Sequence, residues 1–88
     1  MTGIKMRIKG EKDAEAACAA GREVARSIGM VEVMEDCLTG AIKKLTQEAL
    51  REAGGGVFVL YDESDSERVS LRLLIKGGGE GIRISFLR

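Results

Sequence analysis

The chain has 88 residues, of which 44% are hydrophobic and 32% are charged, and its fourteen basic residues balance its fourteen acidic ones. This length and hydrophobic content favour one small folded domain over residues 1–88 and argue against a disordered chain. Zero net charge removes the simplest electrostatic argument for a nucleic-acid-binding protein, and the absence of any long apolar run excludes a transmembrane helix.

Residues 3–9 alternate between apolar and basic side chains, which predicts a half-buried strand with a basic outer face. A helix is expected from Asp13 to about Ile28, because small apolar residues recur there at spacings of three and four. Gly21 falls within this apolar stripe and is typical of very close packing on a neighbouring element. Gly29 then predicts the end of the helix.

The stretch from Val31 to Gly56 predicts one long amphipathic helix of about 22 residues, or roughly 33 Å. Its last three residues are glycines, and a left-handed glycine is a common helix terminator. We expect the polar side of this helix, which includes Glu35, to face solvent. The opposite stripe is apolar and should face the core: Met34, Leu38, Ala41, Ile42, Leu45 and Ala49.

Three further strands are predicted at residues 57–61, 69–76 and 82–87, with a polar hairpin loop at 62–67. That loop lacks the glycine and terminal glutamate of an EF-hand calcium loop, so we expect it to be solvated. The element order is therefore β-α-α-β-β-β. This order predicts an α+β two-layer sandwich in which two helices pack on one face of a mainly antiparallel four-stranded sheet.

Two helices cover only one sheet face, so the other face should be open to solvent or to a partner. A basic face with apolar residues between the charges could bind a nucleic-acid backbone or an acidic protein, or it could simply be solvated. Leu87 is expected on this face, with Phe58 and Leu60 as further candidates. The predicted interaction residues are Lys5, Arg7, Lys9, Arg72, Leu74, Lys76 and Arg83.

The side chains that usually perform catalysis are scarce. The chain has no histidine, and Cys18 and Cys37 lie on or beside apolar helix stripes, where we expect two buried thiols in a reduced, cytoplasmic protein. No spacing resembles a metal site, so we expect neither an enzyme nor a bound cofactor or metal. The glycines at 54–56 and 77–81 could form anion-binding nests, although a helix cap and a loose hairpin explain them as well.

Several stretches, taken in order, follow the pattern of one known family: Asp13, Gly21–Arg26, Ile28–Met30, Ala41–Glu48, Ala53–Gly56 and Ile75–Ile82. This pattern resembles the anti-sigma-factor and stressosome-type serine kinases, which belong to the GHKL (Bergerat-fold) ATPases. The first part is similar to that family's first helix, the second to its N-box helix, and the last to its G1 glycine box.

The departures from the family concern its catalytic residues. The family's N-box glutamate and its magnesium-binding asparagine correspond to Lys44 and Glu48, and the chain contains no asparagine. The aspartate that reads the adenine amino group corresponds to Gly77, and only Gly79 and Gly81 keep the family's glycines. The resemblance implies a truncated, degenerate relative that has lost nucleotide hydrolysis. A residual nucleotide or anion site at these five residues is left open.

Three functions are compatible with these patterns. The first is a small non-catalytic regulatory or scaffolding module that binds another protein, which agrees with the partner-binding habit of the family it resembles. The second is nucleic-acid binding by the basic sheet face, and the third is residual nucleotide or anion binding. Scarce amide side chains and abundant charge also favour a thermophilic source. The patterns leave the partner, the strand order and the oligomeric state open.

Overall fold

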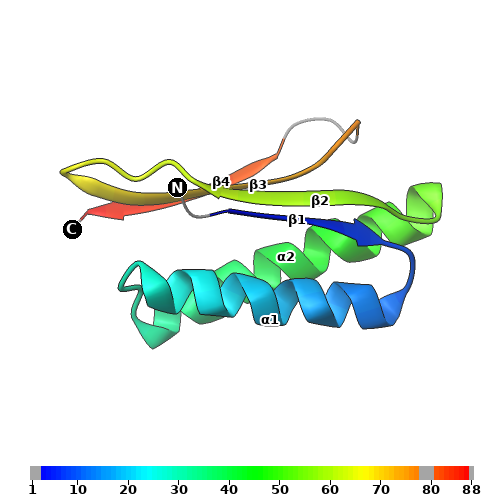
Figure 1. The fold of residues 1–88 in the computed structure, drawn as a ribbon, viewed down its shortest axis with the longest axis horizontal. Helices are drawn as coiled ribbons and strands as arrows, with labels where there is room; N and C mark the ends of the chain where they lie inside the picture. Colours follow the sequence, from blue (N-terminus) through cyan, green and yellow to red (C-terminus); the bar gives the residue numbers. More distant parts are fainter. Residues whose placement is uncertain (1–2, 78–80, 88) are drawn as a thin grey trace.

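A computed structural model describes residues 3–77 and 81–87, and it confirms the predicted order β-α-α-β-β-β. The two helices form one layer and the sheet forms the other (Figure 1). The four strands are all antiparallel and follow chain order across the sheet. The elements are β1 (Gly3–Ile8), α1 (Glu11–Ser27), α2 (Glu32–Ala53), β2 (Gly56–Asp62), β3 (Arg68–Ile75) and β4 (Ile82–Leu87).

The core lies between the two layers. Helix α1 packs on β1 and on α2, whereas α2 packs on β2 and β3. Because aromatic residues are few, aliphatic side chains supply most of the buried volume, and Phe58 is the one fully buried aromatic side chain among the described residues. The largest fully buried side chains are Phe58, Ile8, Leu38, Ile42, Leu60, Leu71 and Leu73.

Glycines set the end of α2 and its connection to the sheet. Gly54 takes the left-handed conformation with φ 72°, and the Gly54 and Gly55 N–H groups donate to the carbonyls of Leu50 and Ala49 at 3.1 and 3.0 Å. This geometry satisfies two of the carbonyls that a helix end leaves without partners. A Cβ atom at Gly55 would also clash with the Ile8 carbonyl oxygen. The prediction of a glycine terminator is confirmed.

The prediction for the two apolar side chains of β2 was wrong. Phe58 and Leu60 were candidates for the outer face, but both are fully buried against the helices. Their neighbours Val57, Val59 and Tyr61 point outward instead. The run from Val57 to Tyr61 is apolar at every position, so its sequence has no alternation that could indicate which set faces the core.

Two expectations for the helices were also wrong. Glu35 is buried, and its Oε1 accepts a hydrogen bond from Arg26 Nε at 3.1 Å. Cys37 is exposed and Cys18 is only partly buried. Thr46 is fully buried as well, and its hydroxyl donates to the carbonyls of its own helix. The buried stripe of α2 is thus centred on Glu35, Leu38, Ile42 and Thr46.

Candidate interaction surface

The face of the sheet that points away from the helices carries an aliphatic strip. In the strand register, Lys5 lies beside Val59, and Val59 lies beside Leu74. Val57 pairs with Arg7 on one side, and its carbonyl accepts the Lys76 N–H at 2.9 Å on the other. We call this surface the open face and define it by the outward residues Lys5, Arg7, Val57, Val59, Tyr61, Arg72, Leu74, Lys76 and Arg83.

Positive charge is concentrated at the end of the open face nearest Lys76. The nearby Lys76 ammonium, through both a side-chain contact and charge repulsion, lowers the pKa of Lys5 below its ordinary value. Arg7 extends from the same strand as Lys5 and is exposed. Three cations therefore border Val57 and Val59, which are only partly buried. Such a group of like charges favours the approach of an anion.

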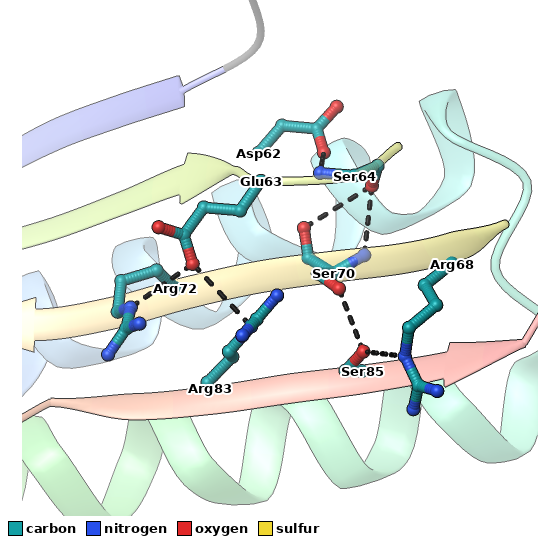
Figure 2. Close-up of polar contacts among 8 residues, drawn as sticks. All are labelled: Asp62, Glu63, Ser64, Arg68, Ser70, Arg72, Arg83 and Ser85. Carbon is teal, nitrogen blue, oxygen red and sulfur yellow. Dashed lines mark hydrogen bonds and ion pairs between the residues drawn. The ribbon is translucent and has the colours of Figure 1, made fainter. Parts of the chain in front are cut away.

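The other two cations of the open face are already paired. Glu63 Oε1 lies 3.2 Å from Arg72 Nε and 3.7 Å from Arg83 Nε, so one carboxylate bridges two neighbouring strands (Figure 2). Arg72 and Arg83 face each other in the β3–β4 register, which explains why one acid can reach both. Sequence reasoning placed both arginines on this face but missed Glu63, because it assigned that residue to a solvated loop.

The loop that follows β2 closes one end of the open face. The Ser64 hydroxyl accepts the Ser70 N–H at 2.9 Å, and the Ser70 hydroxyl lies 2.8 Å from that of Ser85 (Figure 2). Arg68 Nε donates to the same Ser85 hydroxyl at 2.9 Å. Ser70 is consequently only 1% exposed although it lies on the outer side of the sheet. The accessible part of the open face is therefore the half around Lys5, Arg7 and Lys76.

The remaining predicted interaction residue is Lys9. Lys9 follows the end of β1, and its backbone N–H donates to the Asp13 carboxylate at 2.8 Å. Asp13 thereby stabilises the start of α1, where the Gly10 cap has no side chain of its own. The side chain of Lys9 is exposed, and Lys9 lines a shallow depression together with Arg7 and Val57 of the open face and the glycines at 54–56.

Some of the residues of the predicted nucleotide site do meet at a cleft. Glu48 and Gly77 line a cleft of about 140 Å³ between α2 and the end of β3, together with Glu52 and Lys76. Lys44 is exposed outside its lining, Gly81 precedes β4, and Gly79 lies outside the described residues. Ligand pockets usually measure about 300–1,000 Å³, and the two glutamates would repel phosphate groups. The cleft is therefore small and acidic for a nucleotide.

Within residues 3–77 and 81–87, no cluster of three or more cysteine, aspartate or glutamate residues could hold a metal ion. None of the helices in this part of the chain is long and apolar enough to span a membrane.

Comparisons with known protein families, with curated proteins and with solved structures found no match. The resemblance to the GHKL ATPases therefore stays a prediction.

Proposed function

We propose that the protein is a small non-catalytic regulatory or scaffolding module whose open face binds an acidic segment of another protein. The observation that carries this proposal is the arrangement of Lys5, Arg7 and Lys76 around a partly exposed aliphatic strip. The strip offers apolar contact, and the cations offer charge complementarity to carboxylates. The two free thiols, Cys18 and Cys37, support a reducing, cytoplasmic location as part of the same proposal.

An acidic protein fits this surface better than a nucleic acid does. Single-stranded nucleic acids are usually held by several exposed aromatic side chains on which bases stack. Tyr61 is the one aromatic residue on the open face, and the strip beside it consists of Val57, Val59 and Leu74. Aliphatic groups of this kind match the apolar side chains of an extended peptide more closely than they match bases.

The test is an amide NMR titration with a synthetic peptide that alternates glutamate and leucine. We expect shifts at the open face, centred on Lys5, Val57, Val59 and Leu74. The double variant Lys5→Glu, Arg7→Glu should bind about tenfold more weakly or worse, since each surface charge contact contributes about 0.2–1 kcal/mol and reversal adds repulsion. The peptide carboxylates attract the charged form of Lys5. Because the pKa of Lys5 is lowered, its ammonium group loses its charge at a lower pH than an ordinary lysine, so peptide binding should weaken at alkaline pH.

The matched control carries the same charge change on the other layer. Lys43→Glu, Lys44→Glu alters two exposed residues of α2, and peptide binding should persist in this variant. Shifts confined to the helices, or equal binding by both double variants, would refute the proposal. A single-stranded oligonucleotide that binds the same face more tightly than the peptide would favour the nucleic-acid alternative. Magnesium-ATP shifts at Glu48 and Gly77 would favour the nucleotide alternative.

A further inference from the structure

Strand β4 forms a free edge of the sheet. It lies last in the strand order, and among the described elements it packs extensively only against β3. The backbone N–H and C=O groups on its other side are therefore available to pair with another strand. The opposite edge, β1, differs because α1 packs on its inner side and because its outer side carries Lys5 and Arg7, and charged side chains on an edge strand disfavour pairing with another strand.

The side of β4 that faces the helix layer is apolar and incompletely covered. Ile82, Ile84 and Phe86 pair with Leu73, Leu71 and Val69 of β3. The β3 residues are buried, whereas the β4 residues are only partly buried. The difference arises because α2 packs on β2 and β3 and leaves the last strand at the margin of the helix layer. An added strand would extend the sheet and cover this margin.

We propose that β4 pairs antiparallel with β4 of a second copy about a twofold axis at Ile84. In this register Ile84 faces Ile84 of the second copy, and Ile82 faces its Phe86. All three inward residues thus gain apolar cross-strand neighbours. The twofold axis can pass through the Ile84 pair whether the two residues form a hydrogen-bonded or a non-hydrogen-bonded antiparallel pair.

The outward residues of β4 fit the same register. Arg83 faces the neutral Ser85 of the second copy, so the two arginines are not directly opposed. Leu87, which is 70% exposed, faces Gly81 of the second copy, where no side chain competes for space. A shift by one residue would place inward residues opposite outward ones, and a shift by two would leave one apolar residue unpaired at each end. Because β4 is complementary to itself in this register, a second copy of the chain fits its free edge.

The expected dimer is weak. Pairing of two strands of six residues buries less than the roughly 800 Å² per partner of a standard protein interface. Because the interface is small, we expect a dissociation constant of roughly 10 µM to 1 mM, so the equilibrium should be visible over this range of protein concentration. Sedimentation equilibrium over this range should show a mass that rises from 9.5 kDa towards twice that value.

Cysteine cross-linking tests the register. In a background with Cys18→Ala and Cys37→Ser, the variant Ile84→Cys should form an intermolecular disulfide under mild oxidation. Cα atoms across an antiparallel pair lie about 4.5 or 5.5 Å apart, which is within disulfide range. The matched control Ile82→Cys faces residue 86 of the second copy and should cross-link far more slowly. Lys5→Cys, on the opposite edge, should behave like that control.

Each outcome decides the proposal. Rapid cross-linking of Ile84→Cys alone, with a concentration-dependent mass for the unmodified chain, supports it. A monomer mass at about 1 mM, or preferred cross-linking at Lys5→Cys or Ile82→Cys, overturns it. If a cysteine variant does not fold, hydrogen exchange of the unmodified protein gives the answer. The β4 amides that point away from β3 should be protected at high concentration, and exchange at the same rate as exposed amides would overturn the proposal.

Discussion

The two cysteines lie in different surroundings, and their chemistry should differ accordingly. Cys37 is exposed on α2. Cys18 is partly buried, its Sγ lies 3.8 Å from the Thr39 carbonyl oxygen, and burial raises the pKa of its thiol. A raised pKa leaves less of the nucleophilic thiolate near neutral pH.

We therefore expect Cys37 to be alkylated about tenfold faster than Cys18, or more, at roughly pH 8. A short pulse of iodoacetamide followed by peptide mass spectrometry measures both rates in one sample. The two residues should react alike in denaturant, which serves as the control. Equal rates in the folded protein would contradict the structure. The raised pKa of Cys18 also means that its contribution to stability is present below the ordinary thiol pKa and is lost as the pH rises through the raised value.

Single polar residues were the hardest to place from sequence. Glu35 and Thr46 are three residues before Leu38 and four after Ile42, which are spacings that continue the buried stripe. Glu35 was expected on the solvent side of the helix, and Thr46 was not among the residues expected in the core, yet each finds a partner on the helices. The Glu35 carboxylate accepts from Arg26, and the Thr46 hydroxyl donates within its own turn. Such satisfied polar groups cannot be recognised by hydropathy alone, because their partners are set by tertiary packing.

The two mid-helix glycines, one in α1 and one in α2, have different surroundings. A Cβ atom at Gly21 of α1 would clash with Ile42 Cδ1 of α2, whereas one at Gly40 would meet nothing within 4 Å. The glycine in the first helix was predicted to allow close packing, and it lies buried at the contact between the helices.

Alanine substitutions at these two sites should separate the effect of helix propensity on stability from the effect of packing between the helices. Gly40→Ala should raise the free energy of unfolding by about 0.5–1 kcal/mol through helix propensity. Gly21→Ala gains the same propensity term but must displace a fully buried isoleucine, and overpacking of this kind costs about 1–3 kcal/mol. Urea unfolding followed by circular dichroism measures both values. Equal stabilisation by the two substitutions would show that the helices are not packed as closely as described.

The elements themselves were well predicted because their limits depend on local chemistry. The end of the long helix follows from Gly54, and the loop after β2 follows from aspartates whose carboxylates accept backbone N–H groups at 2.8 Å. Which side chains of β2 face the core was not predictable from an unbroken apolar run, and Phe58 lies in the core. The candidate surface was therefore only partly predicted: its cations were found, but its aliphatic strip was assigned the wrong residues of β2.

The order of the strands in the sheet was left open by the sequence, and in the structure it follows the order of the chain. Short connections explain the neighbouring positions of β2, β3 and β4. The position of β1 beside β2 instead depends on the helical hairpin and on the close approach of Gly55 to Ile8. Contacts between residues so distant in sequence have no local pattern, which is why the sheet class was predictable and its order was not.

Positive and negative charges are distributed unequally between the sheet layer and the helix layer. The outward side of the sheet is basic apart from Glu63, while acidic residues outnumber basic ones in both helices. The protein should therefore have a large electric dipole and adsorb to a cation-exchange resin near pH 7 despite its zero formal charge. Lys5→Glu, Arg7→Glu should elute at lower salt than Lys43→Glu, Lys44→Glu, although both variants have the same net charge. Identical elution would mean that no such dipole exists. A molecule with this dipole turns the open face of its sheet toward any negatively charged surface.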